Sequence, residues 1–228
     1  MGSIGNNLQE VKRRIASASI SAGRDANKVT LLAVSKTFPA AAVREAHAVG
    51  QREFGENYVQ EAQAKRAQLH ALPLEWHLIG HLQSNKAELA AEVFDWVQSV
   101  DRAKLVTALA RHRPELRAPL NVLIQVNIDD EASKHGCAPG QVAALAALIA
   151  AEPRLRLRGL MAIPAPHPES ELRRAAYRRM ATLLAELAQA HVQVDTLSMG
   201  MSDDYALAIA EGATMVRIGT ALFGARGP

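Results

Sequence analysis

The chain has 228 residues, of which 49% are hydrophobic and 21% are charged, and its formal net charge is +3; this is the composition of an ordinary globular protein that buries one large core. The excess arginines are scattered along predicted helices instead of clustering in a stripe with aromatic residues, which disfavours a nucleic-acid-binding protein. The single cysteine, Cys137, excludes an internal disulfide, and without a signal peptide or an apolar run of about 20 residues we expect a soluble, cytoplasmic protein with no membrane span.

In chain order, the sequence begins with a predicted amphipathic helix over residues 8–22 and then alternates short apolar runs with longer helical patterns. The predicted strands cover residues 31–35, 53–55, 76–80, 120–126, 155–161, 192–199 and 214–218, and residues 93–100 contain a further one, the fourth in chain order. The predicted helices between them cover residues 39–49, 58–69, 85–92, 102–111, 139–151, 169–190 and 203–211. Gly50 and Gly212 follow two of these helices and Pro139 opens another, as is typical of helix ends and helix starts.

This alternation predicts the α/β fold class. A strand followed by a helix, repeated about eight times, predicts a single (β/α)8 TIM-type barrel, here with an extra N-terminal helix. A doubly wound open sheet shows the same alternation, but its most diagnostic motif, G-x-G-x-x-G after the first strand, is missing from this sequence. No linker or break in composition divides the chain, so we expect one domain over residues 1–228.

Lys36 follows the first predicted strand directly. If its side chain points into the barrel, the two-residue period of a strand places Leu32 and Val34 on the same inner face. Burial of the amine would lower its pKa, and an unprotonated amine can attack an aldehyde to form a Schiff base. A lysine that extends its amine to solvent at a strand end is the alternative, and Lys36 alone does not decide between the two.

The loops after the last two predicted strands have the composition of a phosphate site. Ser202 is expected to cap a helix that begins at Asp203, and Gly219 and Thr220 follow the eighth strand. In such barrels the loops after strands seven and eight bind phosphate, because glycines let backbone N–H groups approach the anion. The carboxylates of Asp203 and Asp204 would then have to point away from the phosphate.

A closed barrel brings its first and eighth strands together, so Lys36 would lie beside the phosphate site with Arg217 between them. This geometry fits a small phosphorylated aldehyde. His77 and His81 would lie about 13 Å apart along a strand, and no cluster of carboxylates or cysteines adds further ligands, so a metal site is not expected. We expect His81 to contact a ligand at a strand end and His77 to be structural.

Seven segments of the sequence closely resemble the pyridoxal phosphate homeostasis proteins. They are residues 33–37 (AVSKT), 54–61 (FGENYVQE), 77–86 (HLIGHLQSNK), 125–127 (QVN), 159–161 (GLM), 197–202 (LSMGMS) and 216–219 (VRIG). The resemblance runs from about residue 8 to residue 224, and motifs of this length are specific. His135 departs from the pattern, because a small residue is common at its position in that family.

The resemblance implies a fold type III barrel similar to the N-terminal domain of alanine racemase, with pyridoxal 5′-phosphate (PLP) held as a Schiff base on Lys36. It places Arg217 opposite the pyridine nitrogen of the cofactor. The other cofactor-binding residues that it implies are Asn57, His81, Met161, Ser198, Ser202, Gly219 and Thr220. It also implies a carrier or regulator in intracellular PLP (vitamin B6) homeostasis, without an established catalytic reaction.

The chemistry of the residues is consistent with a carrier. An arginine beside the pyridine nitrogen keeps that nitrogen unprotonated and makes the ring a weaker electron sink. Racemisation also needs an acid–base group on each face of the substrate; in the racemases a tyrosine from a second domain supplies one, and we expect no such domain here. We therefore expect a PLP-binding monomer with no catalytic residue, whose candidate partners are apo PLP-dependent enzymes.

Two alternatives stay open. The first is a PLP-dependent amino-acid racemase or a related side activity. The second is a Schiff-base aldolase without PLP, which would need an acid–base carboxylate near Lys36, and no predicted strand end offers an obvious one.

Overall fold

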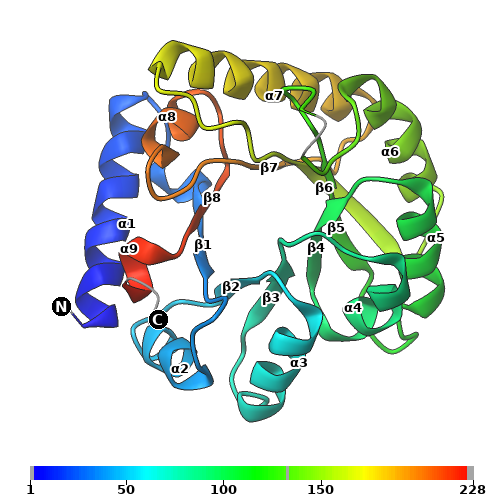
Figure 1. Ribbon diagram of the computed structural model, residues 1–228, viewed down its shortest axis with the longest axis horizontal. Helices are drawn as coiled ribbons and strands as arrows, with labels where there is room; N and C mark the ends of the chain where they lie inside the picture. Colours follow the sequence, from blue (N-terminus) through cyan, green and yellow to red (C-terminus); the bar gives the residue numbers. More distant parts are fainter. Residues whose placement is uncertain (1–2, 132–133, 225–228) are drawn as a thin grey trace.

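The computed structural model describes residues 3–131 and 134–224. Eight parallel strands close into a barrel in chain order, and β8 pairs with β1 (Figure 1). The strands are β1 (Thr30–Val34), β2 (Glu53–Glu56), β3 (Glu75–Leu78), β4 (Trp96–Val100), β5 (Leu120–Gln125), β6 (Leu155–Met161), β7 (Thr196–Ser198) and β8 (Met215–Ile218). The predicted (β/α)8 barrel is confirmed, and the open sheet is excluded because every strand has two neighbours.

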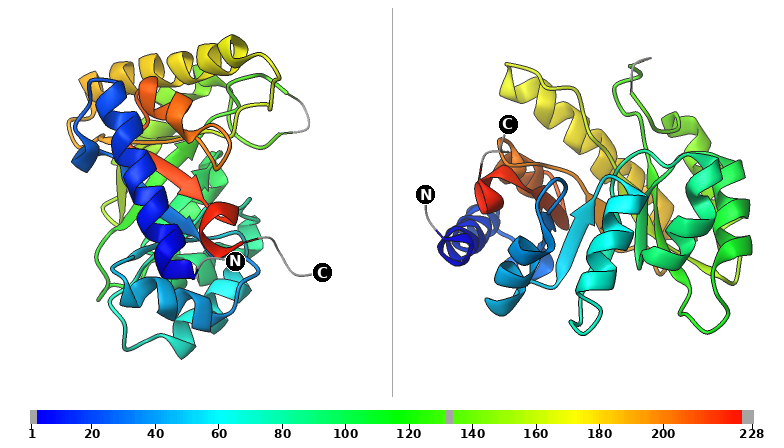
Figure 2. Two further views of the ribbon diagram at one scale, coloured as in Figure 1. Left: turned by 90° about the vertical axis from the view of Figure 1, so that its left-hand side faces the viewer. Right: turned by 60° about the horizontal axis from the view of Figure 1, so that its bottom comes forward.

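Helices surround the barrel wall, as the two side views show (Figure 2). The predicted extra helix is α1 (Ile4–Ser21), which begins earlier than residue 8 because the Ser3 hydroxyl accepts a hydrogen bond from the Asn6 N–H. The other α-helices are α2 (Ala40–Ala48), α3 (Val59–Gln68), α4 (Ala87–Val93), α5 (Ala103–His112), α6 (Val142–Ala150), α7 (Ser170–Ala190), α8 (Tyr205–Ala210) and α9 (Thr220–Phe223). In the described part of the chain, no helix has the length and apolar character needed to cross a bilayer.

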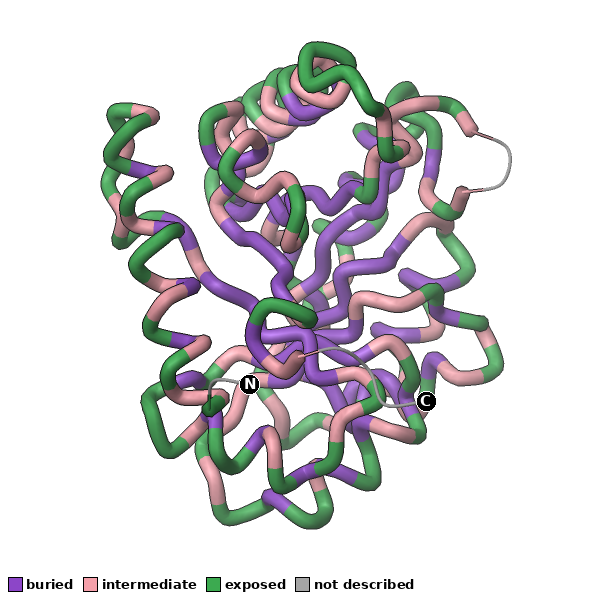
Figure 3. Tube along the Cα trace, turned by 60° about the vertical axis from the view of Figure 1, so that its left-hand side comes forward, coloured by how far each residue is buried: buried purple, intermediate pink, exposed green. Residues whose placement is uncertain are grey.

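Two apolar layers hold the barrel together, one outside its wall and one inside it. Val122 and Ile124 of β5 belong to the large cluster that includes the buried faces of the helices, whereas Leu123 between them packs with Trp96 and Met161. Strands buried on both faces read as nearly continuous apolar runs, which is why the strand positions could be read from the sequence. Figure 3 shows these buried strands at the centre of the molecule and the exposed helical surfaces around them.

The strand register places the functional side chains near one another at the carboxyl ends. Leu32 of β1 pairs with Arg217 of β8, so the strand that leads to Lys36 lies beside the strand that carries the arginine. In a barrel of parallel strands the carboxyl ends all open on the same face, and the loops that follow them surround one site.

The segment before α8 differs from the prediction. The helix expected to begin at Asp203 begins at Tyr205, so Ser202 is not its N-cap. Asp204 takes that position, although its side chain makes no capping bond to the helix. Its carboxylate instead accepts hydrogen bonds from the Met201 N–H at 2.8 Å and from the Tyr177 hydroxyl at 2.8 Å. These two bonds hold the residues before the helix in a turn.

The seventh strand is also shorter than predicted. β7 covers Thr196–Ser198, whereas the sequence predicted residues 192–199. Val192 is 95% exposed, so the apolar character at the start of that run does not mark a buried strand.

Candidate functional site

A cavity of about 390 Å³ opens at the carboxyl end of the barrel, a volume within the range of small-molecule sites. The loops after β1, β2, β3, β5, β6, β7 and β8, together with the ends of β1, β5 and β8, form its wall. The lining residues are Val34, Lys36, Phe38, Asn57, Ile79, Gly80, His81, Gln125, His135, Ile163, Met201, Ser202, Asp203, Arg217, Gly219 and Thr220.

Most of the residues singled out in the sequence lie together on this wall. They are Lys36, Asn57, His81, Ser202, Arg217, Gly219 and Thr220. The other two, Met161 and Ser198, are buried below the cavity rather than on its wall. Met161 packs against Trp96 and Leu123 inside the barrel, and Ser198 hydrogen-bonds to Arg217.

Lys36 lies in the turn that follows β1, with Val34 beside it on the cavity wall. The next residue, Thr37, has a φ of 69°, a left-handed conformation that costs a β-branched residue about 1–2 kcal/mol. The Thr37 N–H donates a hydrogen bond of 2.5 Å to Oε1 of Glu61 on α3. This bond fixes the turn and therefore the point from which the Lys36 side chain leaves the backbone.

A buried ionic cluster under this turn was not predicted. Lys65 of α3 donates hydrogen bonds of 2.7 Å to the Ser35 carbonyl and to Oε1 of Glu56, and one of 2.8 Å to Oε1 of Glu61. The Ser35 hydroxyl also donates to Oε1 of Glu56, at 2.5 Å. The cluster therefore ties the ends of β1 and β2 to α3.

The sequence does carry a weak signal of this cluster. Val59, Ala62 and Lys65 are spaced three apart, so they share the buried face of α3. Glu56 ends a strand that is otherwise apolar at its last positions. A charge buried in such places needs a partner of opposite sign. Lys65 and Glu56 have opposite charges and both lie at positions expected to be buried, so the sequence could have suggested that they pair.

Arg217 forms the cationic floor of the cavity. Its Nη1–H donates to the Ser198 hydroxyl at 2.9 Å and its Nη2–H donates to the Ala162 carbonyl at 2.9 Å. Burial lowers the pKa of Arg217 to about 10, although Tyr177 and Asp204 act in the opposite direction. The guanidinium is therefore still positively charged at neutral pH, and its orientation is fixed by two hydrogen bonds.

The side of the cavity formed by the loops after β7 and β8 carries hydroxyl groups. Ser202 and Thr220 line it from the loops after β7 and β8. Gly219 stands so close to β1 that a Cβ there would be 3.1 Å from the Val34 carbonyl oxygen. Asp204 is bonded to Met201 and Tyr177 and does not line the cavity, as expected, whereas Asp203 does line it.

Two histidines stack at the mouth of the cavity. The rings of His81 and His135 have centroids 3.8 Å apart and planes 15° apart. Burial lowers the pKa of His81, with further lowering by His135 and Arg102 and an opposing effect from Asp101. His81 is therefore neutral at physiological pH, and its ring connects the β3 loop with the loop after β5.

The chemistry of the site is that of an anion receptor with a lysine at one side. Among the described residues, no three histidine, cysteine or acidic side chains gather where they could hold a metal ion. Cys137 is buried and its pKa is raised to about 11 by burial, so its thiol is a poor nucleophile at neutral pH. The cavity instead offers a guanidinium, two hydroxyl groups and a lysine, with apolar walls from Val34 and Ile79.

These residues fit PLP. Val34 and Ile79 offer apolar surface to a flat ring, the buried Arg217 offers N–H donors to a ring nitrogen, and Ser202 and Thr220 offer hydroxyl donors to a phosphate. Lys36 lines the same cavity and supplies the primary amine that an aldehyde requires.

Comparison with known sequences gives a consistent result. Residues 4–227 match the family described as alanine racemase, N-terminal domain. The chain is similar to the pyridoxal phosphate homeostasis protein of Pseudomonas aeruginosa, with 58% identity over 226 residues that cover 99% of this chain and 97% of that protein. It is also similar to the protein of the same name from Escherichia coli (strain K12), with 53% identity over 229 residues that cover 99% and 98% of the two chains.

Solved structures agree with this comparison. PipY of Synechococcus elongatus superimposes with a TM-score of 0.87 in its structure without PLP and 0.83 in its structure with PLP bound. The identities are 42% and 41%, and each comparison covers 97% of this chain and 100% of PipY. Alanine racemase of Bacillus anthracis, at 18% identity and a TM-score of 0.72 over 97% of this chain and 55% of its own, shares the fold.

Proposed function

This chain belongs to the pyridoxal phosphate homeostasis proteins and carries the alanine racemase N-terminal domain, and we propose on that basis that it binds PLP and acts in PLP homeostasis. The observation that supports this most directly is the joint position of Lys36 and the buried Arg217 on one cavity wall. PipY, whose structure with PLP bound has the same fold, is a relative of 41% identity.

Within this proposal, Lys36 holds the cofactor as a Schiff base. When bound, PLP supplies an aldehyde for this bond and an electron-withdrawing ring. Arg217 faces the ring nitrogen as a hydrogen-bond donor, and Ser202, Gly219 and Thr220 bind the phosphate. Asn57 and His81 border the ring, while Ser198 and Met161 support the site from below, Ser198 through its bond to Arg217.

The cavity favours a carrier over a racemase. Racemisation needs a second acid–base group on the substrate face opposite the lysine. The three tyrosines of the sequence are Tyr58, Tyr177 and Tyr205, and among the described residues that line the cavity there is no tyrosine. Tyr177 is buried and donates its hydroxyl hydrogen to Asp204, and burial raises its pKa far above the usual range.

We further propose that residues 1–228 act as one domain and as a cytoplasmic monomer, and that apo PLP-dependent enzymes receive the cofactor. The open carboxyl face of the barrel supports such a role, because a bound cofactor could leave through it without a subunit having to separate.

Reduction with borohydride tests the cofactor site. The protein is mixed with PLP, reduced, digested and analysed by mass spectrometry, and the adduct is expected on Lys36. Lys36→Arg is the matched control, because it keeps the positive charge but has no amine for the aldehyde; it should yield no adduct in the cavity. An adduct spread over surface lysines in both proteins would contradict the proposal.

A second measurement tests delivery. The protein loaded with PLP is mixed with an apo PLP-dependent enzyme, and the rate at which PLP moves to the enzyme is measured. This rate is compared with the rate at which PLP dissociates from the protein into a chemical trap. Transfer faster than dissociation supports direct delivery. Transfer no faster than dissociation would mean that the cofactor travels free in solution, and Lys36-dependent turnover of an amino acid would contradict a pure carrier.

A further inference from the structure

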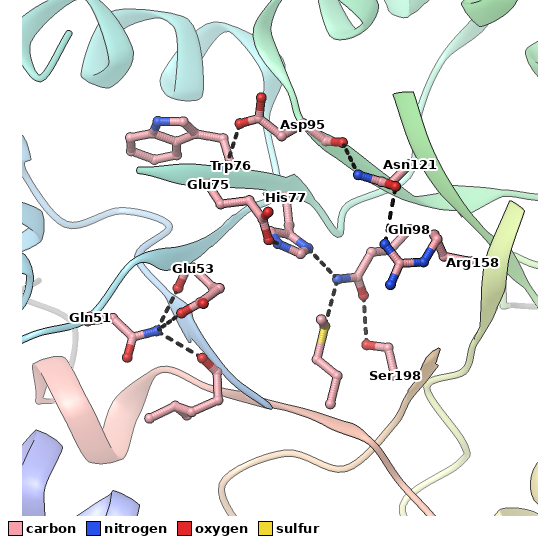
Figure 4. Close-up of polar contacts among 12 residues, drawn as sticks. Gln51, Glu53, Glu75, Trp76, His77, Asp95, Gln98, Asn121, Arg158 and Ser198 are labelled. Carbon is pink, nitrogen blue, oxygen red and sulfur yellow. Dashed lines mark hydrogen bonds and ion pairs between the residues drawn. The ribbon is translucent and has the colours of Figure 1, made fainter. Parts of the chain in front are cut away.

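A chain of hydrogen bonds, buried except at its Glu75 end, crosses the inside of the barrel from its amino-terminal end to the cavity floor. It joins Glu75, His77, Gln98, Ser198 and Arg217 in that order, and we name these five residues the barrel relay. Figure 4 shows its part from Glu75 to Ser198. We propose that Glu75, His77 and Gln98 are positioning residues that act through Ser198 to hold the Arg217 guanidinium in place for the cofactor ring.

The distances in the relay are all those of good hydrogen bonds. Arg217 Nη1 is 2.9 Å from Ser198 Oγ, and Ser198 Oγ is 2.7 Å from Gln98 Oε1. Gln98 Nε2 is 2.9 Å from Nδ1 of His77, and Nε2 of His77 is 2.9 Å from Oε1 of Glu75. The five residues lie on strands β3, β4, β7 and β8, so the relay spans the interior of the barrel.

Each hydrogen in the relay has only one possible place. Arginine can only donate, so Ser198 Oγ accepts from Arg217 and must give its own hydrogen to Gln98 Oε1. The amide nitrogen of Gln98 can only donate, so Nδ1 of His77 accepts and the ring proton is on Nε2, facing the Glu75 carboxylate. The second Gln98 N–H donates to the Met215 sulfur at 3.1 Å, which fixes the orientation of the amide.

The charges at the two ends favour this single direction. Arg217 is the cation at one end. At the other end, burial is the largest single effect on the pKa of Glu75 and acts to raise it, but His77, Trp96 and Arg158 together outweigh it. The pKa of Glu75 is therefore lowered, and Glu75 is an anion. Each N–H and O–H that forms a link of the relay points away from the cation and toward the anion, which is the alignment that both charges stabilise.

Water cannot replace the hydrogen bonds in the interior of the relay. The side chains of His77, Gln98 and Ser198 are fully buried, and the His77 ring stacks on Trp96 with ring centroids 5.1 Å apart. Removal of one link therefore leaves its neighbour without a partner, which is the costly case for a buried polar group. We conclude that the relay transmits a change at Gln98 to Arg217, although Gln98 does not line the cavity.

The tautomer of His77 tests the relay without any cofactor. In histidine labelled with nitrogen-15, the ring spectrum of the wild-type protein should show a proton on Nε2 alone. In Gln98→Glu the new carboxylate still accepts from Ser198 but cannot donate to Nδ1, so His77 is expected to hold a proton on both nitrogens. A wild-type proton on Nδ1, or a ring unchanged in Gln98→Glu, would overturn the proposal.

The Arg217 N–H signals provide the second readout without cofactor. They should be sharp in the wild-type protein and in Gln98→Glu, where the Ser198 acceptor is retained, and broadened in Gln98→Leu and Ser198→Ala. Gln51→Leu is the matched control, because Gln51 is equally buried and donates to the Leu31 carbonyl at 2.8 Å away from the relay. Equal broadening in Gln51→Leu and Gln98→Leu would show a general loss of structure and contradict the relay.

PLP affinity connects the relay to the cofactor, and this part rests on the proposed function. Gln98→Leu and Ser198→Ala are expected to weaken PLP binding about tenfold, the effect of one hydrogen bond to a charged group, whereas Gln98→Glu and Gln51→Leu should stay within about twofold of the wild-type protein. Equal affinities in all four variants would overturn the link to the cofactor. If the wild-type protein forms no adduct on Lys36, the proposed function fails, while the His77 and Arg217 spectra still decide whether the relay positions Arg217.

Discussion

The Nζ atom of Lys65 lies 2.7 Å from Oε1 of Glu56, and both side chains are buried directly beneath the turn that carries Lys36. The pair connects α3 to the carboxyl end of β2, and the bond from Lys65 to the Ser35 carbonyl extends the connection to β1. A change in this pair therefore acts on the residue that we propose to hold the cofactor.

Lys65→Met is expected to lower the free energy of unfolding by about 3–5 kcal/mol, because it leaves the Glu56 carboxylate buried without its partner. Urea unfolding at neutral pH measures this loss. Lys104→Met is the control, since Lys104 is exposed on α5, and its effect should stay within about 0.5 kcal/mol. Equal losses in the two variants would show that the buried pair does not stabilise the fold.

Glu56 should make stability depend on pH in a definite direction. Burial raises the pKa of Glu56 above its ordinary value of 4.5, although the bonds from Lys65 and Ser35 act to lower it. The folded protein therefore keeps this proton to higher pH than the unfolded chain does. The contribution of the Glu56 carboxyl to stability is fully present below pH 4.5 and decreases as the pH rises through the folded-state pKa.

Glu56→Gln isolates this contribution because glutamine does not ionise. The free energy of unfolding of the wild-type protein minus that of Glu56→Gln should decrease as the pH is raised from about 4 to 7. Denaturant unfolding at several pH values gives this difference. A difference that is constant or increases with pH would contradict a raised pKa.

Gly80→Ala should both destabilise the fold and weaken cofactor binding. A Cβ at Gly80 would lie 2.2 Å from the Asn57 carbonyl oxygen, so the loops after β2 and β3 would have to move apart. Overpacking of this kind costs about 1–3 kcal/mol. Gly140→Ala is the control, because no atom other than those of the nearest residues in the chain lies within 4 Å of the added Cβ. Thermal unfolding and PLP titration should show a lower melting temperature and weaker PLP binding for Gly80→Ala than for Gly140→Ala. Identical behaviour of the two variants would contradict the prediction.

The pKa of His81 is expected to lie below 6.5 in the folded protein, since burial and the neighbouring His135 and Arg102 outweigh the attraction of Asp101. The neutral ring is then favoured by folding, so its contribution to stability is present above pH 6.5 and is lost as the pH falls through the lowered pKa. Nuclear magnetic resonance titration of the ring protons measures this value directly.

His135→Ala should raise the pKa of His81 toward 6.5, because it removes both a covering ring and a nearby charge at low pH. His70→Ala is the control, since His70 is exposed just after the end of α3, outside this stack, and its one hydrogen bond among the described residues is to the Ala67 carbonyl. A pKa of His81 that is equal in both variants would show that the stack has no electrostatic effect.

The sequence by itself determined the order of strands and helices and the end of the barrel at which the candidate cavity opens. Parallel strands buried on both faces leave apolar runs in the sequence, and helices leave amphipathic patterns, so both kinds of element could be located one by one. Because a closed barrel of such units gathers the strand ends on one face, Lys36, Arg217 and Thr220 could be expected to meet there.

The tertiary structure alone decided which buried polar groups support that site. The Glu56 bond to Lys65 and the relay from Glu75 to Arg217 depend on strand register and side-chain direction, and Gln98 meets Ser198 across 100 positions of the sequence. The same is true of the turn before α8, where Asp204 stands in the place expected for Ser202 and accepts a hydrogen bond from Tyr177 of α7. Periodicity records whether a position is buried, but a polar side chain must find its partner in space, and nothing local in the sequence specifies a partner that only the closed barrel brings within hydrogen-bonding distance.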